Sequence, residues 1–186
     1  MISPDSCLSL LRSRRSVRAY LPDPVDSRKI SNCIEAARLA PSACNAQPWT
    51  FVVVDDPGLK DAVAVAASGG ILPMNHFTRQ APVLIVVVRE SANLTSKLGQ
   101  IMKDKPYPLI DNGIAVAHFC IQAFAEGLGT CIIGWFEEKK VKKLLGIPSD
   151  KRAELLITVG YAADNEKKHE KIRKPIESMS CRNHYY

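Results

Sequence analysis

One stretch of the sequence predicts a helix that is apolar on nearly every side. Between residues 110 and 128, apolar side chains recur every three or four positions, and Ala115, Phe119 and Ala123 make the other sides apolar too. A helix with this pattern is buried all round, because no face of it favours water. The rest of the chain therefore has to surround a central helix, which Gly127 brings to an end.

Apolar runs and helical spacings predict the remaining elements. Four runs predict strands, at residues 49–54, 82–88, 130–136 and 154–161. Four stretches predict shorter helices, at residues 6–11, 27–40, 59–67 and 137–145. Strands and helices alternate only in part, which favours an α+β sandwich of helices around one sheet. Without an internal repeat or a boundary, residues 1–186 are expected to form a single domain.

Local signals refine two of these helices and describe two of the connecting segments. Leu8 and Leu11 are expected to face inward from the first helix, and Asp26 or Ser27 is expected to cap the second. Residues 55–58 predict a turn. Residues 91–108 have charges and prolines but no clear periodicity, so they predict an exposed segment.

The composition is that of a soluble globular chain. The 186 residues are 46% hydrophobic and 24% charged, enough for one sizeable core. No apolar stretch approaches the roughly 20 residues that span a bilayer. Residues 1–11 lack the cationic start and apolar block of a secretory signal, so a cytoplasmic location is the expectation.

The six cysteines do not predict a metal centre. They are scattered at positions 7, 33, 44, 120, 131 and 181, with no C-x-x-C pair and no clustered histidines. Reduced, buried thiols are the simplest interpretation. Cys44 differs because it lies in a polar loop, but a catalytic thiol needs a partner base, which the sequence does not identify.

The formal net charge of +6 is compatible with nucleic acid, anionic substrates or phosphorylated cofactors. The densest charged run, residues 137–145, places Glu138 four residues before Lys142 and keeps an apolar inner face. It therefore indicates a solvated helix surface rather than a nucleic-acid patch.

A polar loop and two basic segments predict a ligand site. The loop runs from Pro41 to Gln47, between a helix and a strand, where proteins often hold ligands. Alternate residues of an extended segment share a face, so Ser16 and Arg18 point one way; Lys171 and Arg173 form a second such pair or belong to a solvated tail. Charge-assisted hydrogen bonds contribute about 1.5–3 kcal/mol each. With no P-loop or dinucleotide-binding glycine motif, these segments predict a flat, polar-edged ligand that carries a phosphate.

These segments together resemble the FMN-dependent nitroreductase family. Its two N-terminal hallmarks are similar to Arg14-Arg15-Ser16-Val17-Arg18 and Pro41-Ser42-x-x-Asn45-x-Gln47-Pro48-Trp49-x-Phe51. The resemblance continues in order through residues 81–87, 111–115, 125–131, 146–148, 160–161 and 171–175, and so covers nearly the whole chain.

The resemblance implies a three-layer α/β/α sandwich with a mainly antiparallel central sheet, assembled as an intertwined homodimer with FMN at the interface. Residues 165–186 would form a C-terminal extension that embraces the partner subunit. The matching positions imply these FMN-binding residues: Arg14, Arg15, Ser16, Arg18, Lys171 and Arg173 around the ring edge and phosphate, Pro41, Ser42, Ala43, Asn45 and Gln47 from the other subunit, and Asn75, Ile132, Ile133 and Gly134 beside the ring.

The implied reaction has two steps. NAD(P)H gives a hydride to the flavin N5 and leaves, and an electron-poor acceptor of the nitroaromatic or quinone class then takes its place, in a ping-pong mechanism. Arg18 is the candidate cation that stabilises the reduced flavin. Because the flavin carries the chemistry, no catalytic side chain and no metal are implied.

Other functions are compatible with the same residues. A flavin-binding or flavin-sensing protein without turnover would carry the same site, and a flavin-consuming oxygenase of the same fold is a further alternative. The positive charge leaves a basic nucleic-acid-binding domain as a third hypothesis, but no motif supports it. We therefore expect neither a nucleic-acid nor a membrane partner.

Overall fold

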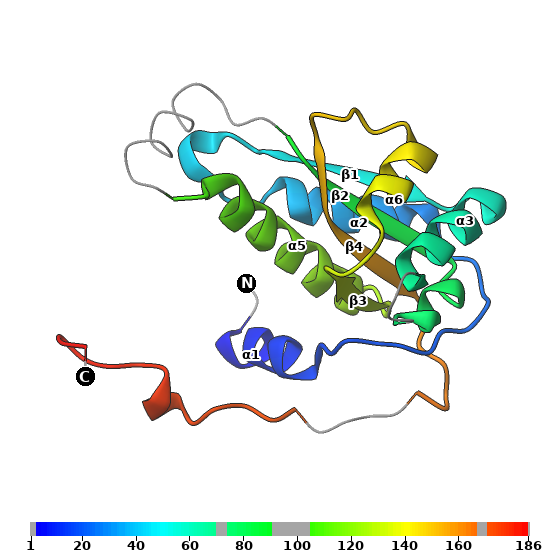
Figure 1. The fold of residues 1–186 in the computed structure, drawn as a ribbon. Helices are drawn as coiled ribbons and strands as arrows, with labels where there is room; N and C mark the ends of the chain where they lie inside the picture. Colours follow the sequence, from blue (N-terminus) through cyan, green and yellow to red (C-terminus); the bar gives the residue numbers. More distant parts are fainter. Residues whose placement is uncertain (1–2, 70–73, 91–104, 167–170, 186) are drawn as a thin grey trace.

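The computed structural model describes residues 3–69, 74–90, 105–166 and 171–185. Its centre is a four-stranded sheet with the order β1-β2-β4-β3, and every neighbouring pair is antiparallel (Figure 1). The strands are β1 (Trp49–Val54), β2 (Val83–Arg89), β3 (Gly129–Ile133) and β4 (Arg152–Gly160). The expected antiparallel sheet is confirmed, although its third predicted strand ends at Ile133 rather than at residue 136.

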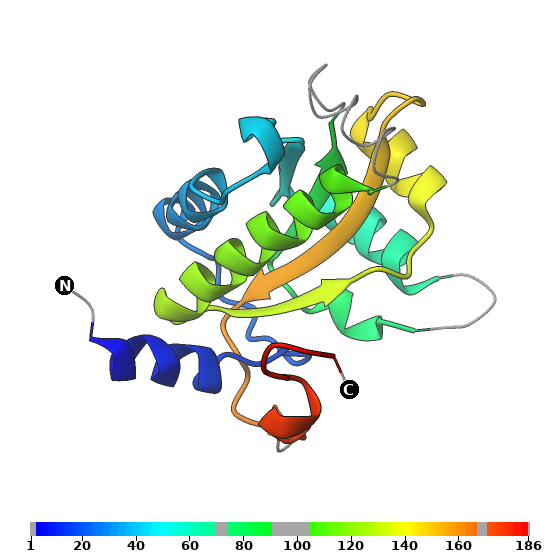
Figure 2. The ribbon, with the colours of Figure 1, turned by 90° about the vertical axis from the view of Figure 1, so that its left-hand side faces the viewer.

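Helices cover both faces of the sheet, which confirms the three-layer α+β sandwich (Figures 1 and 2). One face carries α2 (Ser27–Arg38) and α5 (Tyr107–Ala125), and the other carries α3 (Pro57–Ser68) and α6 (Glu138–Leu145).

Strand β2 shows why the core is continuous. Its odd-numbered residues from Val83 to Val87 pack with α2 and α5, and its even-numbered residues from Leu84 to Val88 pack with α3 and α6. Successive side chains of a strand point to opposite faces. Because both faces are covered, β2 is apolar at every position before Arg89.

Helix starts follow local signals. The predicted cap is confirmed at Asp26, whose carboxylate accepts a hydrogen bond from the Arg28 N–H (2.8 Å). The predicted turn at residues 55–58 is wrong, because it starts α3: the Asp56 carboxylate accepts from the Leu59 N–H (2.8 Å), and Pro57 suits the first helical turn.

Helix α5 is central but not buried all round. Phe119 stacks on Phe51 of β1, with ring centroids 5.7 Å apart. On the opposite side Ile110 is 50% exposed, and Leu109 next to it is 41% exposed. The prediction of a helix buried on all sides is therefore wrong for the single chain, since none of its described elements covers this strip.

Helix α1 (Pro4–Ser13) and the C-terminal arm (residues 171–185) lie beyond the β3 edge of the sheet (Figure 2). Leu8 and Leu11, predicted to face inward, are 45% and 46% exposed, and α1 has no buried residue in this chain. The predicted inward orientation is therefore wrong for the single chain. The arm contains one short turn, η3 (Ile176–Ser178).

Most of the predicted exposed segment at residues 91–108 falls outside the described residues. In the parts of the chain that are described, no helix has both the length and the apolar character to cross a bilayer.

Candidate functional site

A cationic segment, residues 14–18, follows α1 along the outer edge of β3. The Val17 N–H donates to the Thr130 carbonyl (2.9 Å), and the Val17 side chain packs closely over Gly129. Val17 is buried and Arg18 is exposed, which confirms the predicted alternation of the extended segment.

The thiol of Cys131, on β3, lies next to this segment. Burial raises the pKa of the Cys131 thiol, and the neighbouring Arg18, Ser16 and Arg14 lower it only in part. These interactions put the side chains of Ser16 and Arg18, and the charge of Arg14, beside the middle of β3. Because burial dominates, Cys131 is a neutral thiol and not an activated nucleophile.

The C-terminal arm brings a second set of cations to the same place. The Lys171 ammonium donates to the carbonyls of Arg12 and Leu11 in the last turn of α1. Partial burial first, and then the positive charges of Arg14 and Arg173, lower the pKa of Lys171. Residues from the two ends of the chain therefore converge, as the predicted phosphate site requires.

Arg15 is separated from this cluster. Its guanidinium forms an ion pair with Glu166, whose side chain is only 6% exposed. The carboxylate of Glu166 also accepts from the Arg18 N–H (3.4 Å). Arg15 thus shares the inward side of the segment with Val17, while Arg14, Ser16 and Arg18 face the other way.

The end of β3 is an open sheet edge. Ile132 and Gly134 are exposed, whereas the Ile133 side chain is buried in the core and Ile133 pairs with Leu156 of β4, so the structure offers no exposed group of Ile133 for the predicted ligand contact. Asn75 precedes η2 (His76–Arg79) and donates from its amide nitrogen to the carbonyl of Trp135 (3.0 Å). Asn75 therefore lies beside the end of β3 and holds the chain just after it.

The polar loop is preformed, around the short turn η1 (Ala43–Asn45). The Ser42 hydroxyl accepts from the Gln47 N–H (3.0 Å), and the Ala43 N–H donates to the carboxylate of Asp111 on α5 (3.2 Å to each oxygen). Asn45 and Gln47 have positive φ angles of 52° and 47°. Such conformations are costly for residues other than glycine, so the loop depends on these hydrogen bonds.

The loop lies far from the cationic segment of the same chain. In the register of the sheet, Trp49, just after the loop, pairs with Arg89, which pairs with Arg152 of β4. Thr130, which contacts the cationic segment, pairs with Val159 near the other end of β4. Seven residues of β4 correspond to about 23 Å along the strands, and the full width of the sheet adds about 14 Å across them. One mononucleotide-sized ligand cannot touch both groups in one chain.

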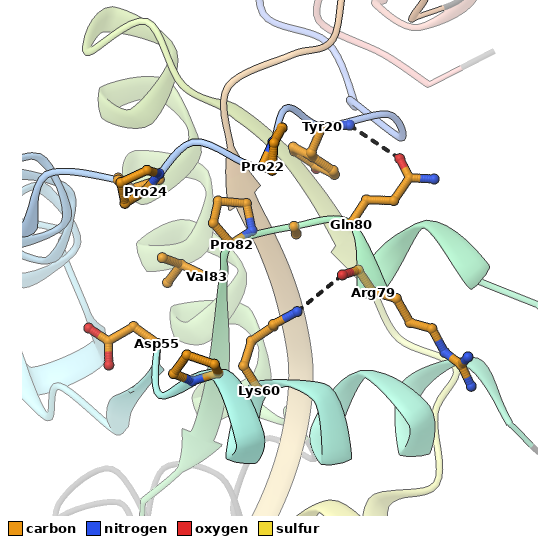
Figure 3. Close-up of a pocket in the computed structure, with 12 residues that line it drawn as sticks. Tyr20, Pro22, Pro24, Asp55, Lys60, Arg79, Gln80, Pro82 and Val83 are labelled. Carbon is orange, nitrogen blue, oxygen red and sulfur yellow. Dashed lines mark hydrogen bonds between the residues drawn. The ribbon is translucent and has the colours of Figure 1, made fainter.

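A large cavity of the described residues contains no predicted site residue. It has about 630 Å³ and lies between Tyr20, Lys60, Arg79 and a group of prolines (Figure 3). Two polar contacts lie in its wall: Lys60 donates to the Arg79 carbonyl (3.1 Å), and the Tyr20 N–H donates to the Gln80 side chain (3.3 Å). We therefore place the candidate site at the β3 edge. No cluster of metal-ligating side chains occurs in the described residues.

Sequence reasoning missed Glu166, which lies in a polar stretch that predicts no element. Its partner Arg15 is 151 residues away, a separation that no periodicity or cap signals. Only its place after the last strand, where the chain turns back toward α1, is a hint.

Known proteins resemble this chain over most of its length. The model of the nitroreductase family matches residues 11–75 and 72–161. An NADH dehydrogenase of Thermus thermophilus is 28% identical over 89% of this chain and 90% of its own. An iodotyrosine deiodinase of Drosophila melanogaster is 30% identical over 83% of this chain and 62% of its own. The solved structure of an FMN-dependent nitroreductase from Clostridium difficile has a TM-score of 0.75 at 27% identity, covering 96% of this chain and 99% of that one. The chain therefore belongs to the nitroreductase family of oxidoreductases, as its ordered motifs indicated.

Proposed function

We propose that this chain is an FMN-dependent NAD(P)H oxidoreductase that passes electrons to an electron-poor small molecule of the nitroaromatic or quinone class. The observation that carries the proposal is the convergence of Arg14, Arg18 and Lys171 beside the open edge of β3. The names of the relatives, an NADH dehydrogenase and an FMN-dependent nitroreductase, support the choice of cofactor and electron donor.

The donor set suits a phosphate. Arg14, Arg18, Lys171 and Arg173 supply positive charges, and Arg14 and Arg173 lie close enough to Lys171 to lower its pKa. The lowered pKa of Lys171 reflects burial and this mutual repulsion, which a phosphate dianion would relieve. Charge-assisted hydrogen bonds of about 1.5–3 kcal/mol each would hold it.

When bound, FMN would supply the hydride chemistry that links oxidation of NAD(P)H to reduction of the acceptor. The chain's own residues hold and orient it. Arg18 supplies a positive charge that stabilises negative charge on a ring edge. The backbone at Ile132 and Gly134 offers hydrogen bonds at the open edge, and Asn75 keeps the end of β3 in place through the Trp135 carbonyl.

The separation of the loop from the cationic segment supports a homodimer. In our proposal, residues 41–47 of one chain complete the site formed by residues 14–18 and 171–173 of the other. The uncovered strip at Leu109 and Ile110 and the exposed apolar side of α1 are surfaces that a second copy would bury. The arm from residue 171 onward, where Ile172 is 91% exposed, would embrace the partner.

The first experiment tests cofactor and turnover. The purified protein is titrated with FMN and followed by flavin fluorescence; anaerobic NADH and NADPH are then added, and a panel of nitroaromatics, quinones and iodotyrosine is offered as acceptors. The deiodinase relative motivates the last of these. We expect saturable FMN binding, bleaching by at least one nicotinamide and reoxidation by a nitroaromatic or quinone. No FMN binding would overturn the proposal, and binding without bleaching would leave a flavin-sensing protein instead.

The second experiment tests the shared site. Arg18→Glu damages the cationic segment, and Asn45→Asp damages the loop without changing its tolerance for positive φ. A mixed dimer of the two variants has one doubly damaged site and one intact site. Recovery of FMN binding on mixing supports the shared site, and no recovery in a dimer with one copy of each variant contradicts it.

A further inference from the structure

A buried ion pair joins the two cationic stretches. Glu166 belongs to the segment that follows β4, and Arg15 belongs to the segment that follows α1. The Glu166 side chain is 6% exposed, and that of Arg15 is 25% exposed. A carboxylate so far removed from water needs a paired cation, because an unpaired buried charge is strongly unfavourable.

The pair sits at the end of a longer junction between these segments. The Leu21 N–H donates to the Tyr161 carbonyl (2.9 Å), and the Ala163 N–H donates to the Ala19 carbonyl (3.0 Å). Glu166 then closes the junction by accepting from the Arg18 N–H (3.4 Å). The two segments are therefore held in one fixed register.

This junction determines where both sets of cations lie. On one side Glu166 holds the backbone of Arg18 and turns Arg15 away from Arg14 and Arg18. On the other side Glu166 lies only five residues before Lys171, which reaches the last turn of α1. A shift of Glu166 would move Arg18 relative to Lys171, which is held by the last turn of α1.

We propose that Glu166 and Arg15 form a positioning pair for the phosphate of FMN: Arg15 acts through Glu166 and does not contact the phosphate itself. This inference rests on the proposed function. It assigns Arg15 a different role from the direct contact that the motif implied, because the geometry commits its guanidinium to Glu166.

Long-range electrostatics makes the opposite prediction, which allows a sharp test. Removing a negative charge close to a site for an anion should tighten binding if charge alone matters. If Glu166 instead positions Arg18 and Lys171, then Glu166→Gln should weaken FMN binding by about tenfold, the change that 1.4 kcal/mol produces. Riboflavin lacks the phosphate and keeps only the ring-edge contact of Arg18, so its affinity should fall less than that of FMN.

The experiment measures FMN and riboflavin affinities for the wild-type protein and four variants. Glu166→Gln and Arg15→Gln should each lose FMN affinity, and the double variant should lose no more than either one, because both break the same pair. Arg15→Lys keeps the pair and should stay close to wild type. Asp61→Asn is the control: it removes one negative charge, as Glu166→Gln does, from a carboxylate that is ion-paired to Lys60 on α3. It should leave both affinities unchanged.

Each outcome decides between the two roles. Additive losses in the double variant would mean that Arg15 contacts the phosphate directly, and unchanged or tighter FMN binding by Glu166→Gln would mean that the pair does not position the site. Equal losses for FMN and riboflavin would show general destabilisation, which would also overturn the inference. If the glutamine variants do not fold, loss of FMN affinity by Arg15→Lys would contradict it. Failure of the wild-type protein to bind FMN would instead refute the proposed function.

Discussion

Replacing Gly129 with alanine should separate the cationic segment from the sheet. A Cβ on Gly129 would stand 2.7 Å from the Val17 Cγ2, 2.8 Å from its Cβ and 2.9 Å from its Cγ1. Ordinary carbon–carbon contacts are about 3.5–4.0 Å, so the two segments have to move apart by about 1 Å. The bond from the Val17 N–H to the Thr130 carbonyl, now 2.9 Å, would lengthen to about 3.9 Å, beyond hydrogen-bonding range.

The expected loss of stability has three contributions. Overpacking costs about 1–3 kcal/mol, and the lost hydrogen bond costs about 0.5–1.5 kcal/mol. The lower entropy of the unfolded alanine chain offsets about 0.4–1 kcal/mol. The net loss of about 0.5–4 kcal/mol lowers the Tm by roughly 2–12 °C for a chain of this size. Because Ser16 and Arg18 move with Val17, FMN affinity should also fall by about tenfold.

Thermal unfolding followed by circular dichroism and FMN titration by fluorescence measure the two effects. Gly58→Ala is the matched control: Gly58 lies in α3, and the nearest atom to its added Cβ is an Asp56 carboxylate oxygen at 3.6 Å. Alanine there should be neutral or slightly stabilising. An unchanged Tm and FMN affinity in Gly129→Ala would refute the close approach of Val17 to β3, and so would an equal loss in the control.

Three further changes test other contacts of the site. FMN affinity should fall as the pH rises through the pKa of Lys171, which burial and nearby cations hold below the usual value of about 10.4, and Lys171→Arg should flatten this profile in titrations at several pH values. Asp111→Asn weakens the acceptor for the Ala43 N–H and should reduce FMN and riboflavin affinities alike, by about threefold to tenfold. Tyr20→Phe removes the hydroxyl that donates to the Val17 carbonyl (2.7 Å) and should cost about 1–3 kcal/mol in urea unfolding; no loss would show that this buried bond is not needed.

The sheet and its layers could be predicted because their signals are local. Strand β2 is apolar at six consecutive positions, from Val83 to Val88, which only a strand covered on both faces requires. The start of α2 could be predicted for a similar reason, since Asp26 supplies the capping oxygen within two residues of the N–H that it accepts from.

The inward side of α1 could not be predicted correctly from the spacing of Leu8 and Leu11. Helical spacing shows that two apolar side chains share a face, but it does not show which surface covers that face. In this chain neither residue is covered, and the same is true of Ile110 on α5. A surface supplied by a second copy would leave the same pattern in the sequence as a surface within the chain.

The pairing of Arg15 with Glu166 could not be predicted either. An extended segment shows which of its residues share a face, so Ser16 and Arg18 could be paired from the sequence alone. It does not show which face turns to the sheet. Here the contact between Gly129 and Val17 determines that face. Because Gly129 has no side chain, Val17 can pack against it, and Arg18 then faces outward.

The open edge of β3 explains why we propose that a flat ring binds at this site. Exposed strand edges promote aggregation, so proteins usually cover them. The segment after α1 covers only one end, where the Val17 N–H meets the Thr130 carbonyl. Beyond it, the peptide groups at Ile132 and Gly134 face outward on a strand that already pairs with β4 on its other side. A ring with donors and acceptors along one edge can pair with them in the plane of the sheet, as a further strand would. In our proposal, the cations that hold its phosphate lie just upstream, where Arg14 and Lys171 converge. The strand edge and the cationic cluster would then be two parts of one binding surface, and both depend on the position of Val17.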